Sequence, residues 1–201
     1  MEGSIYRNIQ YEVYQNIFEM IKYRQLTTQT PKIDENLLRE TLRRNQEISI
    51  DAGETIFIMT WTDPNTKFAD YYKIINKAIK NNSRASTKRI SLIGNIKVED
   101  NKDILKILKK LEEDWPDIYV DFISYEQIQI NWPQCSAYIP HRVLPEDDEN
   151  IKYIKETHLE MPRIRMNDTG CLWCGGKPKD IIEIKRLNGT IAYRIVVSAL
   201  M

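Results

Sequence analysis

The sequence lacks an excess of charge of either sign. It contains 29 Lys and Arg residues and 29 Asp and Glu residues, so its formal net charge at pH 7 is zero. A neutral chain has no overall electrostatic attraction to a phosphate backbone or to an anionic membrane. This balance disfavours an autonomous DNA-binding protein.

Long apolar runs are also missing. No stretch reaches the roughly 18 apolar residues of a membrane-spanning helix, and residues 1–8 lack the basic and apolar regions of a signal peptide. We therefore expect an intracellular protein with no membrane partner. Hydrophobic residues still make up 42% of the chain, which is enough to form one large folded domain or two small ones.

Cysteine and histidine are scarce, with three and two residues respectively. Cys171 and Cys174 have the spacing of half a zinc site, but tetrahedral zinc needs two more ligands, and only Cys135, His141 and His158 remain. We expect the cysteines to be thiols that pack as small apolar side chains, and we expect neither a metal nor a cofactor. A zinc-bound adaptor is the alternative.

Known catalytic motifs are absent. The sequence contains neither a P-loop nor the glycine pattern of a dinucleotide site, and neither histidine lies in a nucleophile motif. One pattern favours an alternative function. Glu183 and Lys185 lie on one face of a predicted strand, as metal-dependent nucleases require, and Asp168 could serve as the upstream carboxylate. Such charge spacings are common on exposed strands, so we expect no catalytic residues.

Apolar periodicity predicts helices and then alternating strands and helices in the first part of the chain. The predicted helices cover residues 5–21, 34–45, 68–79 and 104–111, and the predicted strands cover residues 47–51, 55–61, 89–93 and 118–123. Gly53 separates the first two strands, which are candidates for a hairpin. The order strand, helix, strand, helix, strand is typical of an α/β domain.

Three prolines, Pro133, Pro140 and Pro145, indicate a domain boundary near residue 140. Beyond it we expect a helix that begins at Pro145, a strand over residues 161–166, a helical turn over 168–174, and a hairpin of 181–185 with 191–197. Asn188 and Gly189 provide the positive φ angles that a tight hairpin turn needs. This part of the chain is predicted to be a small α+β domain.

The same C-terminal part contains several motifs that occur together in one family. They are Met161-Pro-Arg-Ile164, Asn167-Asp168, Trp173-Cys-Gly-Gly-Lys-Pro-Lys-Asp-Ile-Ile-Glu-Ile-Lys-Arg186 and Ala192-Tyr-Arg-Ile-Val-Val197. Together they resemble the assembly domain of the fifth common subunit of eukaryotic RNA polymerases, a family that also has an archaeal member. Ile139-Pro-His-Arg-Val-Leu144 is similar to the segment that leads into this domain. Residues 1–130 match only the order of elements in the N-terminal jaw domain of the eukaryotic members.

The resemblance implies a non-catalytic structural subunit of a multisubunit DNA-directed RNA polymerase. It implies an α/β jaw domain over residues 1–138 and an α+β assembly domain over 139–201. The assembly domain would dock on the largest subunit, among other polymerase subunits, and the jaw would meet downstream DNA only within the complex. The docking residues so implied are Pro162, Arg163, Ile164, Asp168, Trp173, Gly175, Gly176, Arg186, Tyr193 and Arg194.

The sequence also departs from the family pattern. The family's Asp-Pro is replaced by Asp168-Thr169, its turn glycine after Lys-Pro by Lys179, and its Arg-Pro-Ser-Glu-Thr-Ala-Gly loop by the shorter segment 186–190. These departures, together with abundant Ile, Lys and Asn, favour a member from a large DNA virus. The expected location is then a virion or viral factory, or the nucleus if the protein is cellular.

The compact basic group of the N-terminal part is Arg84, Lys88 and Arg89, and it is flanked by polar residues that can bind phosphate oxygens. Lys97 lies in the loop after the next strand, which the resemblance places near DNA. We therefore expect these four residues to be close to DNA in the polymerase. Solvated loop charges without a ligand are the alternative.

Overall fold

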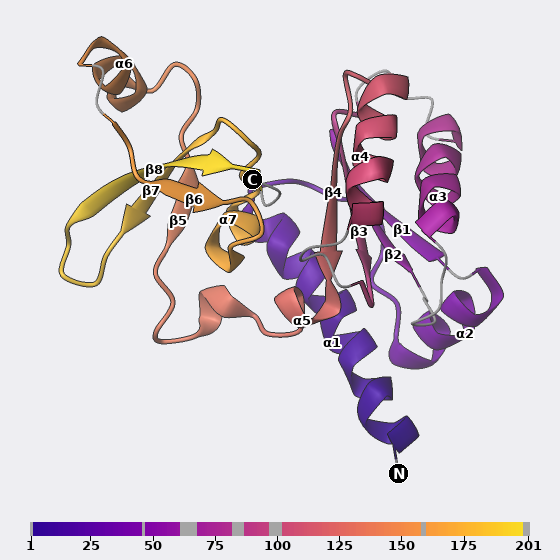
Figure 1. The fold of residues 1–201 in the computed structure, drawn as a ribbon. Coiled ribbons are helices and arrows are strands. Elements are labelled where there is room, and N and C mark those ends of the chain that lie inside the picture. The colour runs from indigo at the N-terminus through magenta and orange to yellow at the C-terminus, as the bar shows by residue number, and fades with distance from the viewer. Residues whose placement is uncertain are drawn as a thin grey trace. The chain divides into compact units, whose positions relative to one another are not determined.

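The computed structural model describes residues 2–45, 47–60, 68–81, 87–96, 102–157 and 160–198. It is a mixed α/β protein with two four-stranded sheets, and within these residues it has seven α-helices. The chain divides into two compact units, residues 1–130 and 131–201, which we call unit 1 and unit 2 (Figure 1). The division lies in the segment that precedes Pro133, upstream of the boundary expected at residue 138. None of the described helices is long and apolar enough to cross a membrane.

Unit 1 contains a sheet with the order β1-β2-β3-β4. Its elements are α1 (Glu2–Tyr23), α2 (Glu35–Asn45), β1 (Glu47–Ala52), β2 (Thr55–Thr60), α3 (Phe68–Asn81), β3 (Arg89–Gly94), α4 (Lys102–Asp114), β4 (Tyr119–Ser124) and α5 (Tyr125–Ile128). The predicted β1–β2 hairpin is confirmed, with Gly53 at a φ of 72° in its turn. β2, β3 and β4 are parallel, as expected for strands joined by helices.

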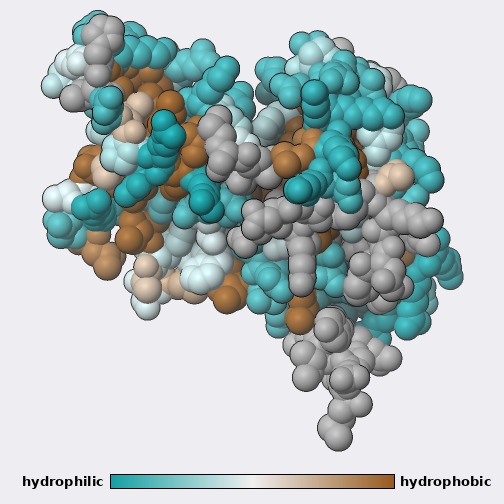
Figure 2. Space-filling view, viewed as in Figure 1, coloured by the Kyte–Doolittle hydropathy of each residue, from teal (hydrophilic) through white to brown (hydrophobic). Residues whose placement is uncertain are grey.

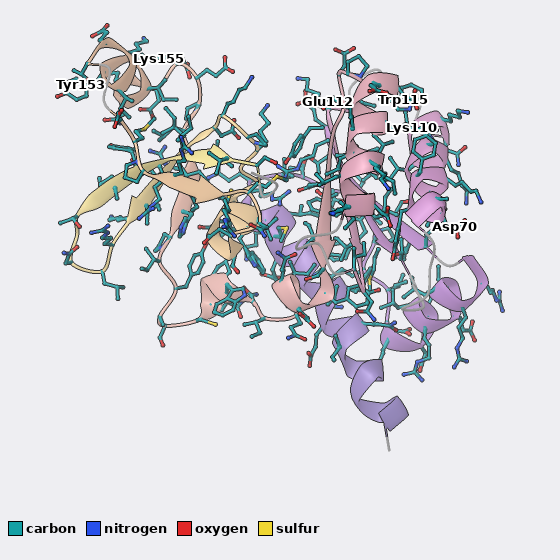
Figure 3. All side chains as sticks on the ribbon, viewed as in Figure 1. Asp70, Lys110, Glu112, Trp115, Tyr153 and Lys155 are labelled. Carbon is teal, nitrogen blue, oxygen red and sulfur yellow. The ribbon has the colours of Figure 1, made fainter. Side chains whose placement is uncertain are left out.

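The helices α3 and α4 cover one face of this sheet. Alternate residues of the parallel strands pack against the apolar side of the two helices in one cluster: Ile56, Ile58, Ile90, Leu92, Val120 and Phe122 with Tyr71, Ile75, Ala78, Ile79, Ile104, Ile107 and Leu111. Trp115, at the end of α4, donates a hydrogen bond from its indole to the side chain of Asn76 at 2.8 Å (Figure 3). This bond links α3 to the end of α4, in addition to the packing of both helices on the sheet.

The helix α1 belongs to the opposite side of the sheet. At its C-terminal end the guanidinium of Arg24 lies over the ring of Phe57 in β2, 5.3 Å from the ring centroid. Farther back, the buried Asn16 amide donates hydrogen bonds to the carbonyl oxygens of Ile128 and Gln129, at 2.8 and 3.0 Å. The amide therefore joins α1 to the end of α5, where unit 1 ends.

Unit 2 contains a sheet with the order β5-β7-β8-β6. Its elements are a 3-10 helix (Trp132–Gln134), β5 (His141–Val143), α6 (Glu149–Glu156), β6 (Arg163–Arg165), α7 (Thr169–Cys174), β7 (Ile181–Lys185) and β8 (Ile191–Val197). The predicted β7–β8 hairpin is confirmed, but in its turn only Gly189 has a positive φ, at 82°, and Asn188 does not. The strand β6 pairs in parallel with β8. One apolar cluster packs Cys171 of α7 against the sheet, and a second packs Ile151 and Ile154 of α6 against Leu144 and Ile181. The two helices thus lie on opposite faces.

Three elements were not predicted from the sequence: β5, α5 and the 3-10 helix. Each is only three or four residues long. Such short segments contain too few residues for a repeated hydrophobic pattern to be recognised. The strand expected over residues 161–166 is shorter in the structure, because Pro162 has no N–H with which to extend the pairing of β6.

Candidate functional site

The short helix α7 is defined by its two ends. Asp168 is its N-cap, and the carboxylate accepts hydrogen bonds from the backbone N–H groups of Gly170 and Cys171 at 2.9 and 3.3 Å. Gly175 ends the helix with a φ of 81°, which is the left-handed conformation that favours glycine. Two of the predicted docking residues, Asp168 and Gly175, therefore shape this helix.

Two glycines allow close approach to α7. A Cβ atom at Gly176 would lie 2.7 Å from the sulfur of Cys171 and 2.9 Å from Ile182. A Cβ atom at Gly170 would lie 2.5 Å from the imidazole ring of His141 in β5. His141 thus packs against the backbone of α7, which gives it a structural role at the edge of the sheet.

The remaining predicted docking residues fall into buried and exposed groups. Trp173 is completely buried and Ile164 is 9% exposed, so both belong to the interior of unit 2. Pro162, Arg163 and Arg186 are exposed at the surface. These last three, together with the exposed Asp168 and the half-buried Tyr193 and Arg194, offer side-chain surface to another molecule.

Backbone contacts connect several of these residues. The Arg194 guanidinium donates a hydrogen bond to the carbonyl oxygen of Arg163 at 3.1 Å, and the backbone N–H of Ile195 donates to the carbonyl oxygen of Pro162 at 3.1 Å. Arg186 lies in the hairpin turn, where its N–H donates to the carbonyl oxygen of Thr190 at 2.9 Å. The structure therefore brings Pro162, Arg163 and Arg194 together along β6 and β8, and places Arg186 in the turn.

A row of polar side chains crosses the α6 face of the sheet. Glu183 of β7 is the cross-strand neighbour of both Arg142 in β5 and Tyr193 in β8. The Arg142 guanidinium donates to both carboxylate oxygens of Glu183 at 3.2 Å. Burial, together with the nearby carboxylates of Glu183 and Asp148, raises the pKa of Tyr193. Arg142 was not singled out in the sequence, because cross-strand pairing is not visible until the register is known.

The carboxylates of the nuclease alternative both have structural partners. Asp168 caps α7 and Glu183 pairs with Arg142, while Lys185 is exposed beside Ile191. Among the residues that the structure describes, no group of three or more His, Cys, Asp or Glu side chains is arranged to hold a metal ion.

The cysteines of unit 2 form no disulfide with one another. Cys171 is completely buried in the apolar cluster beneath α7, as expected for a cysteine that packs as a small apolar side chain. The thiol of Cys174 donates to the carbonyl oxygen of Cys171 at 3.4 Å. His158, the last candidate zinc ligand, lies outside the described residues.

The basic group of unit 1 is only partly described, because Arg84 and Lys97 lie outside the described residues. The exposed Lys88 pairs with Glu54 at 2.7 Å. Arg89 is different: its side chain is 13% exposed and pairs at 2.5 Å with Asp121, which is 1% exposed. The guanidinium of Arg89 also lies 5.2 Å from the ring centroid of Tyr119. Arg89 is therefore part of the interior of unit 1.

The buried carboxylate of Asp121 retains its charge. Burial alone would raise its pKa, but the positive charge and hydrogen bond of Arg89, with a contribution from Arg24, outweigh that effect and lower the pKa. No pattern in the sequence indicated this pair, because Arg89 and Asp121 belong to neighbouring parallel strands and are 32 residues apart.

Comparisons with known proteins identify viral relatives that match nearly the whole chain and archaeal relatives that match a shorter part of it. A protein of African swine fever virus named "DNA-directed RNA polymerase RPB5 homolog" is 24% identical over 197 residues, which cover 92% of this chain and 94% of the viral protein. The archaeal protein "DNA-directed RNA polymerase subunit Rpo5" of Pyrococcus horikoshii is 40% identical over 63 residues, and the match covers 28% of this chain and 77% of that subunit. The counterpart from Pyrococcus abyssi is 36% identical over 63 residues, again 77% of its length. A scan against models of protein families found no match.

These relatives belong to the same family that the motifs between Met161 and Val197 resemble. The archaeal match has high identity over most of a short subunit, and the viral match extends over nearly the whole chain. The chain is therefore a divergent relative of the large-DNA-virus proteins, and it belongs to the family of DNA-directed RNA polymerase subunits that includes archaeal Rpo5 and the viral RPB5 homologues.

Proposed function

We propose that the protein is a non-catalytic structural subunit of a multisubunit DNA-directed RNA polymerase. The observation that supports this function is the relationship to proteins named as polymerase subunits, which covers 92% of the chain in the viral case. In this proposal, residues 139–201 act as the assembly domain and residues 1–138 as the jaw. The protein contributes architecture, and the chemistry of transcription belongs to its partners.

The assembly domain docks on the largest polymerase subunit through its exposed basic residues. Arg163 and Arg186 are both exposed in unit 2, whereas Trp173, Ile164 and Gly176 are buried and give the surface its shape. Arginine suits this role because its planar guanidinium binds carboxylates and stacks on aromatic rings at subunit interfaces.

The jaw lies near downstream DNA only in the assembled polymerase. The residues proposed to lie near DNA are Arg84, Lys88 and Lys97. Arg89 is left out because it pairs with Asp121 inside unit 1. Each phosphate contact contributes about 0.9 to the salt dependence of log affinity, so three contacts on a neutral subunit bind DNA weakly at physiological salt. The same contacts act intramolecularly once other subunits bind the duplex.

The proposal is tested by coexpression of the full chain with the largest subunit of its own polymerase. We expect the two proteins to copurify in a one-to-one complex. The variant with Arg163→Glu and Arg186→Glu should bind at least about tenfold more weakly, because both side chains would repel an acidic partner surface.

A matched control changes the same charge elsewhere in unit 2. Lys152 and Lys155 are exposed on α6, where Tyr153 is also 61% exposed, and Figure 3 shows Tyr153 and Lys155 pointing away from the sheet. The variant with Lys152→Glu and Lys155→Glu should bind like the wild type. Failure of the wild type to copurify would contradict the proposed function, and equal binding by the two variants would contradict docking through the arginines.

A further inference from the structure

The two edges of β8 have different hydrogen-bond partners. The N–H of Arg186 donates to the carbonyl oxygen of Thr190, and the N–H of Val196 donates to the carbonyl oxygen of Asp180. The even-numbered residues of β8 are therefore the ones whose backbone groups bond to β7. In an antiparallel pair, bonded and non-bonded positions alternate. The N–H and C=O groups of Ile191, Tyr193 and Ile195 therefore point to the other edge, toward β6.

Pro162 ends the pairing on that other edge. Ile195 donates to the carbonyl oxygen of Pro162, and β6 then pairs with residues 195–197 of β8. The next bond toward the hairpin turn would need an N–H at position 162, which proline lacks. Within residues 160–198, which the structure describes without a gap, the outward backbone groups of Ile191 and Tyr193 have no backbone partner. A short length of β8 is thus an open sheet edge.

This open edge is short, but it lacks the other two features that usually protect an edge from another strand, namely charged side chains and proline. Natural proteins use short strands, charged side chains and proline for that purpose. The other edges of the sheet have them: β5 and β6 are three residues long, and β6 contains Arg163 and Arg165 directly after Pro162. The segment Ile191-Ala192-Tyr193 is uncharged and contains no proline.

The side chains around the open edge are apolar and basic. Leu187 in the turn is 78% exposed and Ile191 is 52% exposed. Lys185, the cross-strand neighbour of Ile191, and Arg186 are also exposed. From residue 184 to residue 197 the chain contains three basic residues and no acidic residue. Figure 2 shows hydrophobic surface at the end of unit 2 where Figure 1 places the hairpin.

We infer that the Ile191–Tyr193 edge of β8 accepts an extended segment of the largest polymerase subunit as an additional strand. Backbone hydrogen bonds to Ile191 and Tyr193 provide affinity, as in other cases of strand addition. Leu187 and Ile191 contact apolar side chains of that segment, and its acidic side chains face Lys185 and Arg186. The inference rests on the proposed function, and it specifies how the docking occurs.

The first experiment measures hydrogen exchange in the full chain, alone and in complex with the largest subunit. The amides of Ile191 and Tyr193 should exchange at least about tenfold more slowly in the complex, because they gain hydrogen-bond acceptors. The amides of Ala192 and Arg194 already bond to β7 and should change little. Unchanged exchange at Ile191 and Tyr193 in a stable complex would overturn the inference while leaving the proposed function intact.

The second experiment separates the backbone from the side chain. Ile191→Pro removes an outward N–H that the β7–β8 hairpin does not use, and it should weaken binding about tenfold with thermal stability close to that of the wild type. Ile191→Thr retains the N–H and should bind within about threefold of the wild type. Equal binding by Ile191→Pro and the wild type would overturn the inference.

Two other outcomes are decisive. Absence of any complex between the wild type and the largest subunit would overturn both the inference and the proposed function. A homodimer of the free chain that Ile191→Pro dissociates would show that a second copy of this chain, and not a polymerase subunit, occupies the edge.

Discussion

The two units use charged side chains in different ways. In unit 1, Arg89 and Asp121 form an ion pair whose side chains are 13% and 1% exposed. In unit 2, Arg142 and Glu183 form a pair whose side chains are 57% and 17% exposed. A buried pair is costly to break because the remaining charge is not solvated by water, whereas an exposed pair contributes little to the free energy of folding. The comparison teaches that a basic residue in a sequence cannot be assigned to a DNA contact until the structure shows whether it already pairs with an acidic residue inside the fold.

Unit 2 depends instead on close backbone packing. Gly170 and Gly176 allow His141, Cys171 and Ile182 to approach α7 at distances that a Cβ atom would prevent. Three further predictions test this contrast between the buried charge pair of unit 1 and the tight packing around α7 in unit 2.

The largest effect is expected from Asp121→Asn in unit 1. This change leaves the guanidinium of Arg89 buried without its anion and should lower the free energy of unfolding by about 3–5 kcal/mol. Because the pKa of Asp121 is lowered in the folded state, its contribution is present above the unfolded value and is lost as pH falls below about 4. Urea unfolding of the wild type and the variant at several pH values measures both effects.

The matched control for Asp121→Asn is Glu183→Gln in unit 2. Its partner Arg142 is largely exposed, so the change should cost no more than about 1 kcal/mol. Similar losses for the two variants would contradict the contrast between the units.

An intermediate effect is expected from Gly170→Ala in unit 2. The new Cβ would lie 2.5 Å from the imidazole of His141, and the resulting displacement should cost about 1–3 kcal/mol. In a His141→Ala background the clash is absent, and alanine should instead stabilise α7 by up to about 1 kcal/mol through its helix propensity. A double-mutant cycle by thermal unfolding measures this coupling, and simple additivity would show that the two residues do not touch.

The smallest effect is expected from Lys179→Gly. Lys179 has a φ of 79°, which costs a residue with a side chain about 1–2 kcal/mol, whereas glycine adopts it freely at an entropic cost of about 0.5–1 kcal/mol. The variant should therefore be about 0.5–1 kcal/mol more stable than the wild type. Lys177→Gly changes a nearby exposed lysine without a positive φ and should not stabilise the protein.

Long periodic elements and turn signals were predictable from the sequence, whereas pairing partners were not. Repeated isoleucines predicted α1, runs of β-branched and apolar residues predicted the strands of unit 1, and Asn188-Gly189 predicted a turn between β7 and β8. The partners of Arg89 and Glu183 could not be predicted, because they depend on the register of strands that are distant in sequence. For the same reason, residues that share a motif, such as Trp173 and Arg186, could not be separated into surface and interior.

Position 179 departs from the family pattern in its side chain but not in its backbone conformation. The resemblance implies a glycine here, and the structure retains the left-handed conformation although the residue is lysine. Its N–H donates to the carbonyl oxygen of Val196 at 2.9 Å, and Val196 donates in turn to Asp180 at 2.9 Å. These bonds fix the start of β7 irrespective of the side chain.

The Asn16 amide has a consequence for chimeric proteins. Because its two hydrogens reach the carbonyl oxygens of Ile128 and Gln129, the first helix and the last turn of unit 1 form one cooperative piece, although more than 110 residues separate them along the chain. Recombination between relatives that exchanged only the first helix would separate the two halves of this contact. Exchange at the junction after Ile130, where unit 2 begins, would leave it whole, so that junction is the natural point for grafting one unit onto another.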